Sequence, residues 1–204
     1  MRRIENFKVP IYHYDIIRKT KKNGLNAVSL FGEGDNFEKN FKEFISNAIS
    51  KTKLSAIYLN LSVSDFLETV KTREFDPTDK SKKINTITLS CLTLSKDIED
   101  HINGQNEEEK KISETALEVY AKTAIGALTD MIAEEAKKEN SELSLPYFVY
   151  SPFNFDNFIV LDSDFSSYLT KLQSEKIGIK SENGLIVPKY SALFFVYWSL
   201  KKKK

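Results

Sequence analysis

The sequence has few of the residues that build covalent frameworks or metal sites. Of its 204 residues, one is cysteine, two are histidine, seven are glycine and five are proline. The single cysteine, Cys91, excludes an internal disulfide framework and a cysteine-rich zinc site, and it fits a reducing compartment. The scarcity of glycine and proline argues against long disordered linkers. Two histidines are too few for a histidine-rich zinc site.

Long apolar runs are also missing. No segment approaches the roughly 18 apolar residues that a membrane span needs, and the opening MRRIENFKVPIYHYD lacks the apolar core of a signal peptide. We therefore expect a soluble, cytoplasmic protein with no membrane partner. The composition, 41% hydrophobic and 29% charged, is that of a globular protein. The length predicts one globular domain over residues 1–204.

Charge of one sign does not dominate the chain, although its distribution is uneven. The net charge is +1, with seven basic and two acidic residues in 1–22, and 19 basic against 27 acidic residues in 23–200. A duplex-binding protein usually shows a basic face within its folded body. The pattern therefore favours a protein partner or a homo-oligomer over nucleic acid. The lysines at 201–204 are interpreted as a short disordered tail.

Hydrophobic periodicity predicts strands and helices in alternation. Aromatic and β-branched residues in 9–17 and 25–31 indicate two strands, which the Asn23-Gly24 turn would join into an N-terminal hairpin. Further strands are predicted at 56–61, 84–94, 147–150, 158–161 and within 193–200. Amphipathic helices are predicted at 36–51 and 165–173, with a short one capped by Ser62 or Ser64. We therefore predict an α/β or α+β domain in which helices cover a mixed sheet.

The longest predicted helix runs from 107 to about 138. Asn106 is a good N-cap, three glutamates follow it in the first turn, and Lys137 and Lys138 suit the negative end. At ~1.5 Å per residue this helix would be roughly 50 Å long. Its small residues AKTAIGAL allow close packing, so we expect the helix to span the domain or to form a dimer seam.

The stretch NAVSLFGEGDNFEKNFKEF has the strand, glycine turn and helix start of many phosphate sites. It lacks the third glycine of a dinucleotide fingerprint and the Gly-Lys-Ser/Thr of a P-loop. Glu33 and Asp35 would also repel a phosphate unless a cation intervened. The simpler interpretation is that Asp35 caps the next helix and Glu38 completes a capping box.

One acidic constellation follows the apolar run FIVL. Asp162 and Asp164 could together hold one Mg²⁺ or Mn²⁺, with Glu33 or Asp35 as a third carboxylate, and the ion would bridge substrate phosphates. The alternative is that Asp162 or Ser163 caps the following helix. FIVLDSD looks like the metal-binding Asp-x-Asp of nucleotide-sugar glycosyltransferases, and Glu33 with Asp162 and Asp164 resembles the toprim arrangement of topoisomerases and primases.

Other candidate groups have ordinary structural interpretations. Cys91 falls on the apolar face of a predicted strand, which indicates a buried thiol and not a nucleophile. His13 and His101 lie far apart in the sequence, with no nucleophile elbow to pair with. The aromatic residues of 147–158 could stack bases, but no Lys or Arg lies between 143 and 169, so core packing is the better interpretation.

Three functions from different classes follow. The first is a non-enzymatic protein that binds another protein or assembles with itself, and it needs no cofactor. The second is an enzyme that acts on a nucleotide or nucleic acid with Mg²⁺ or Mn²⁺ at Asp162 and Asp164. The third is a sensor of a small ligand or nucleotide. No catalytic residue can be assigned from the sequence, so whether the protein is an enzyme is left open.

Overall fold

A computed structural model describes residues 1–78 and 83–201, apart from the side chain of Asp35. Residues 79–82 and the last lysines of the predicted tail, 202–204, lie outside this description.

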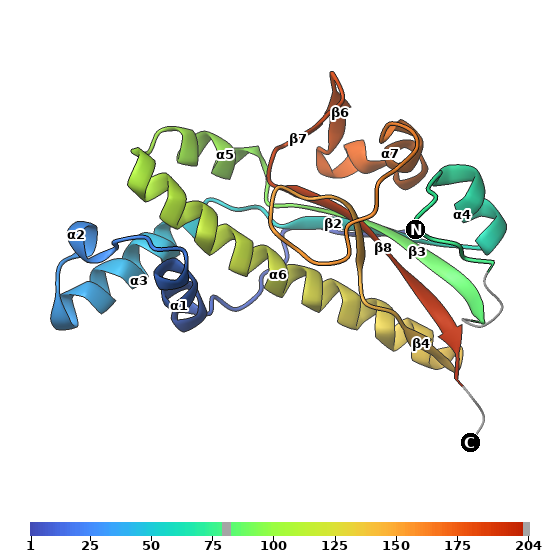
Figure 1. Ribbon diagram of the computed structural model, residues 1–204, viewed down its shortest axis with the longest axis horizontal. Coiled ribbons are helices and arrows are strands. Elements are labelled where there is room, and N and C mark those ends of the chain that lie inside the picture. Colours follow the sequence, from blue (N-terminus) through green and yellow to red (C-terminus); the bar gives the residue numbers. More distant parts are fainter. Residues whose placement is uncertain (79–82, 202–204) are drawn as a thin grey trace.

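The protein has a mixed α/β fold built on one antiparallel sheet. The strand order is β1-β2-β3-β8-β4, and β5 pairs with another part of β8 (Figure 1). The strand bounds are β1 (Arg2–Ile4), β2 (Ser55–Leu61), β3 (Ile84–Thr93), β4 (Ser141–Leu143), β5 (Tyr147–Tyr150) and β8 (Ser191–Leu200). A separate hairpin is formed by β6 (Lys180–Glu182) and β7 (Leu185–Val187). The predicted fold class is confirmed, although the strand pairs are antiparallel where a mixed sheet was expected.

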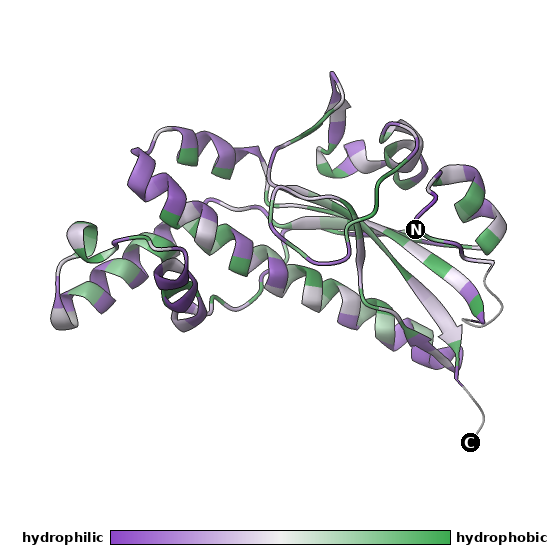
Figure 2. Ribbon diagram, in the orientation of Figure 1, coloured by the Kyte–Doolittle hydropathy of each residue, from purple (hydrophilic) through white to green (hydrophobic). Residues whose placement is uncertain are grey.

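Both faces of the sheet are apolar, and helices cover each of them. Along β8, Phe194 and Trp198 belong to one buried cluster, whereas Leu193 and Phe195 belong to the other, because side chains alternate along a strand. The first face is covered by α6 (Glu107–Lys138). Helices α1 (His13–Lys22), α3 (Gly34–Ser50) and α5 (Lys96–Asn103) pack against α6 and complete the same buried cluster. The second is covered by α4 (Val63–Thr69), α7 (Ser166–Leu172) and the β6–β7 hairpin. Figure 2 shows the apolar bands of α6 alternating with polar ones.

Helix α6 confirms the predicted long helix and its cap. The Asn106 side chain accepts hydrogen bonds from the backbone N–H groups of Glu108 and Glu109, and the Glu109 carboxylate accepts one from the N–H of Asn106. This capping box satisfies donors that the first helical turn leaves open. Neither α6 nor any other helix in the described part of the chain is long and apolar enough to cross a membrane.

The predicted N-terminal hairpin is wrong, because residues 13–22 form helix α1 and 28–31 form the short helix α2 (Val28–Phe31). Ile16 and Thr20, four residues apart, are the buried residues of α1, which packs against α6. A helical period therefore overrides the β-branched composition. The Asn23-Gly24 pair ends α1 and does not turn a hairpin.

The strands at the sheet edges differ from the sequence analysis in two further places. β1 was not predicted. It is a three-residue edge strand whose two arginines suit an exposed position. Residues 158–161 form no strand, and Phe158 makes only an isolated parallel bridge to Phe148. Next to this bridge, the Ile159 N–H donates a hydrogen bond to the backbone carbonyl of Phe148 in β5.

Candidate functional site

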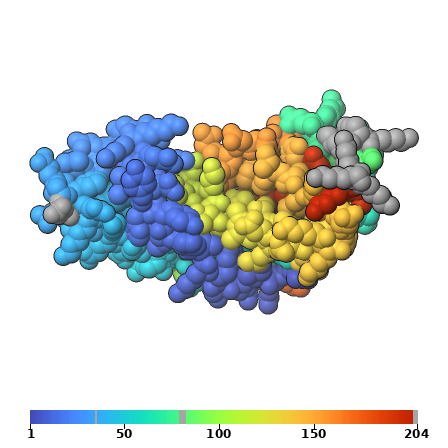
Figure 3. Space-filling view, turned by 90° about the horizontal axis from the view of Figure 1, so that it is seen from below, coloured from blue at the N-terminus to red at the C-terminus, as the bar shows by residue number. Residues whose placement is uncertain are grey.

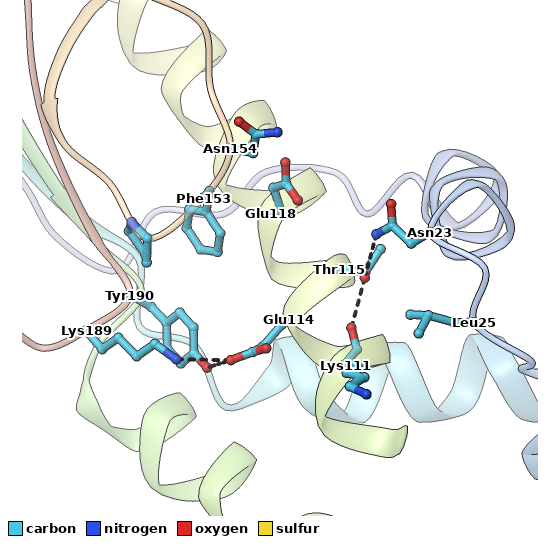
Figure 4. Close-up of a pocket in the computed structure, with 11 residues that line it drawn as sticks. Asn23, Leu25, Lys111, Glu114, Thr115, Glu118, Phe153, Asn154, Lys189 and Tyr190 are labelled. Carbon is cyan, nitrogen blue, oxygen red and sulfur yellow. Dashed lines mark hydrogen bonds and ion pairs between the residues drawn. The ribbon is translucent and has the colours of Figure 1, made fainter. Parts of the chain in front are cut away.

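The candidate site is a cleft of about 470 Å³ over α6. Its walls come from three parts of the chain: the end of α1, the loop 152–154, and residues 189–190 before β8 (Figure 4). In Figure 3 the yellow-green surface of α6 is visible between the blue N-terminal residues and the orange residues near 150. The cleft therefore joins segments that are far apart in the sequence.

One face of α6 forms the floor of the cleft. Lys111, Glu114, Thr115 and Glu118 line it, and their spacings of three and four residues place them in a row on the helix. Thr115 is buried, Glu114 and Glu118 are half-buried, and Lys111 is exposed at the rim. The row therefore brings one positively charged and two negatively charged side chains to the same cleft.

Glu114 is held by two neighbouring residues from the opposite wall. Its carboxylate accepts a hydrogen bond of 2.9 Å from the Tyr190 hydroxyl, and the Lys189 ammonium lies 3.1 Å from the same oxygen. Figure 4 shows both side chains extending toward Glu114. Burial, and then the Glu114 carboxylate, raise the pKa of Tyr190 far above its ordinary value. Tyr190 therefore remains a hydrogen-bond donor over the whole physiological pH range.

Glu118 and Thr115 connect the floor to α1. The Lys19 ammonium lies 2.5 Å from the Glu118 carboxylate, whose side chain is only 16% exposed. The Asn23 amide donates a hydrogen bond of 3.3 Å to the Thr115 hydroxyl, which donates in turn to the backbone carbonyl of Lys111. These contacts hold the end of α1 at a fixed distance from α6.

The chemistry of the cleft suits binding. Its acids are paired with lysines or a tyrosine, and its lining residues include no cysteine, serine or histidine. Phe153 stacks on Tyr190 with ring centroids 6.0 Å apart, which adds an apolar surface beside the charges. A bound group could exchange hydrogen bonds with Asn23, Asn154 and Lys111 while resting on Phe153.

The predicted acidic residues lie in separate places. The segment with Asp162 and Asp164 precedes α7, whereas Glu33 lies between α2 and α3 at the end of the molecule where α1 to α3 gather (Figure 1). The side chain of Asp35 is outside the description. Within the described residues, no group of three or more His, Cys, Asp or Glu side chains is arranged to hold a metal ion.

The local contacts of these acids are structural. Asp162 Oδ2 lies 3.8 Å from Nε of Arg73, and the Asp162 N–H donates to the Lys71 carbonyl. The N-cap position of α7 is Phe165, which makes no side-chain capping hydrogen bond, so neither Asp162 nor Ser163 caps the helix. Asp164, one residue before the N-cap, accepts a hydrogen bond of 3.0 Å from the N–H of Ser166.

The predicted capping box at α3 is also corrected. The N-cap position is Glu33, not Asp35, and its side chain makes no capping hydrogen bond. Glu38 pairs with Lys42 instead, at 2.5 Å. The glycine turn therefore starts the helix without the side-chain cap that the sequence suggested.

The remaining candidate groups are dispersed. Cys91 is fully buried, as predicted, and burial raises its thiol pKa to about 12. His13 lies 3.1 Å from the Ser46 hydroxyl, and burial followed by the nearby Lys42 lowers its pKa. His101 contacts Gln105 on another part of the surface.

Comparison with known proteins adds no identification: no protein-family model matches the chain, and no curated protein sequence is similar to it. The site must therefore be interpreted from its own geometry.

Of the cleft residues, the sequence singled out only Phe153, as one of the aromatic residues of 147–158, and Asn23, as part of a turn. The spacing of Glu114 and Glu118 in the predicted long helix shows that they share a helical face. Nothing in the sequence indicates that Lys189 and Tyr190, more than seventy residues later, oppose that face. The loop 152–154 carries one signal, an aromatic residue next to proline and asparagine, which is too common to identify a site.

Proposed function

We propose that this is a non-enzymatic interaction protein that binds a segment of another protein chain in the cleft over α6. The observation that carries this proposal is the convergence of three separate segments on one concave surface whose acids, Glu114 and Glu118, are already paired with lysines. Paired charges are poor proton donors and acceptors but remain available at their outer edges for hydrogen bonds. Such a surface favours recognition over catalysis.

The charge pattern favours a polypeptide as the bound molecule. Lys111 and Lys189 are exposed at the cleft, while Glu114 and Glu118 lie deeper on its floor. A polypeptide can offer groups of both signs, together with backbone donors and acceptors, along one extended segment. Complementary charges of this kind contribute specificity and faster association. Phe153 and Tyr190 add an apolar surface for one anchoring side chain.

Site-specific cross-linking tests this function. A photoreactive phenylalanine analogue replaces Asn154, an exposed cleft residue, in cells that make the protein. The matched control places the same analogue at Glu68, which is exposed on α4 beyond the other face of the sheet. We expect a discrete adduct from Asn154 that is absent from Glu68, with mass spectrometry identifying the attached chain.

A charge-reversal pair makes the test specific to the cleft. Lys111→Glu should reduce the adduct from Asn154, because it removes a cation from the rim without disturbing a buried contact. Lys138→Glu, at the exposed far end of α6, should leave it unchanged. An adduct between two copies would identify self-assembly, and one with a different chain would identify a partner. Equal labelling from Asn154 and Glu68, or no adduct from either, would contradict the proposal.

A further inference from the structure

A second pocket, separate from the cleft in its chemistry, lies between α1, the 25–28 segment and α3. Its volume is about 240 Å³. Ile17, Leu25, Val28, Phe37 and Phe41 form its apolar walls, and Phe37 and Phe41 stack with ring centroids 5.5 Å apart. The walls therefore suit a flat apolar body.

Thr20 introduces an unsatisfied polar group into this apolar lining. Its side chain is 1% exposed, and its hydroxyl has no hydrogen-bond partner among the described residues. Most buried hydroxyls are paired, because an unpaired one has lost its hydrogen bonds to water without replacement. A ligand that brings a hydrogen-bond acceptor to Thr20 would restore that bond.

Lys21 adds a positive charge to the lining of this pocket. It lines the same pocket and is exposed. Its neighbours Arg18 and Lys19 are paired with Asp15 and Glu118, whereas Lys21 forms no ion pair with any carboxylate in the described part of the chain. An ammonium and an unpaired hydroxyl in the lining of one apolar pocket match an anionic carboxylate.

The volume limits the size of the apolar body. An apolar cavity of about 150 Å³ accommodates a benzene ring. The additional space in this pocket is suited to one small substituent on such a ring. From the apolar walls, the unpaired Thr20 hydroxyl and the free Lys21 ammonium, we propose that this pocket binds a small aromatic monocarboxylate of benzoate or phenylacetate size.

Calorimetric titration of the full chain with benzoate and phenylacetate tests this proposal, with benzyl alcohol as the uncharged comparator. We expect saturable binding of one carboxylate per chain and weaker binding of benzyl alcohol. Lys21→Gln and Thr20→Val should each weaken carboxylate binding about tenfold, since each removes one hydrogen bond to a charged group. Lys22→Gln is the control, because Lys22 is equally exposed but does not line the pocket.

A third variant keeps the test decisive if Thr20→Val fails to fold. Val28→Phe fills the pocket from a position that is 43% exposed, so it should abolish binding while the chain stays folded. Three results would overturn the proposal: no saturable binding of either carboxylate up to about 10 mM, equal losses in Lys21→Gln and Lys22→Gln, or full binding by Val28→Phe. None of these measurements involves a protein partner, so their failure is distinct from failure of the proposed function.

Discussion

The indole N–H of Trp198 donates a hydrogen bond of 2.8 Å to the hydroxyl of Thr88 on the neighbouring strand, and both residues are fully buried. The Thr88 hydroxyl donates in turn to the side-chain carbonyl of Asn60, at 2.8 Å. The Asn60 amide then reaches Glu135 on α6, at 3.3 Å. A chain of polar contacts therefore crosses from β8 through β3 and β2 to the long helix, and it satisfies polar groups that the sheet buries.

Thr88→Val should destabilise the protein by about 1–3 kcal/mol. The substitution keeps the shape of the side chain but leaves the buried Trp198 N–H without its acceptor, whereas the carbonyl of the exposed Asn60 can bond to water instead. The free energy of unfolding in urea measures the effect. Thr88→Ser retains the hydroxyl and should lose less stability than Thr88→Val. Equal losses in the two variants would show that the methyl group, and not the hydrogen bonds, accounts for the effect.

Asn106→Ala should lower the free energy of unfolding by about 1 kcal/mol, because it removes the side chain that caps α6. The comparison is Asn103→Ala, an exposed asparagine in the last turn of α5, which should change stability by much less. Urea denaturation of the two variants beside the wild type measures both. A loss at Asn103 as large as that at Asn106 would argue against the capping role.

Cys91 should react with a thiol reagent only after unfolding. Its side chain is fully buried, and burial raises the thiol pKa to about 12, so almost no thiolate exists near neutral pH. At about pH 8 we expect slow reaction with a disulfide reagent in native buffer and rapid, stoichiometric reaction in concentrated urea. Fast modification of the native protein would instead reveal frequent opening of the sheet beside β3.

Stability should fall at alkaline pH, and Tyr58 should contribute to the fall. Burial, followed by the hydrogen bond to Glu135, raises the pKa of Tyr58 from 10.0 to about 12. Since the folded pKa is the higher one, the contribution is complete below the unfolded value and is lost as pH rises from there toward about 12. The urea concentration at the midpoint of unfolding should therefore decrease as the pH is raised from 10.0 to about 12.

Tyr58→Phe tests the assignment of this pH dependence. The variant should be less stable at neutral pH by about 1 kcal/mol, because Glu135 loses one donor. It should also lose less stability than the wild type on going above pH 10, since this group no longer titrates. Parallel decreases in the two proteins would assign the alkaline transition to other groups, such as Tyr168 or Tyr190, whose pKa values are also raised by burial.

Predictions based on a local signal agree well with the structure. The amphipathic spacing in α3, the alternation in β3 and the Asn106 cap of α6 each place an element within a few residues of its observed bounds. Each signal depends on contacts between residues close in the chain, or on one buried face that imposes a period. The same reasoning correctly predicted that Cys91 is buried on the apolar face of β3.

Predictions failed where composition and packing disagree. Residues 13–22 have an aromatic and β-branched start typical of a strand, but α6 offers a surface that buries Ile16 and Thr20 at helical spacing. Residues 158–161 are apolar enough for a strand, yet Phe158 is the one residue among them that forms a β-bridge to β5. In both places the outcome depends on a neighbour that is distant in sequence.

The sequence by itself determined the fold class, the long capped helix and the burial of the single cysteine, because hydrophobic period, capping chemistry and composition act over a few residues. Only the tertiary structure decided the strand order, the separation of Glu33 from Asp162 and Asp164, and the meeting of Glu114 with Tyr190 over α6. These relationships join segments far apart along the chain. They are set by which apolar surfaces pack together, and no short stretch of sequence records that choice.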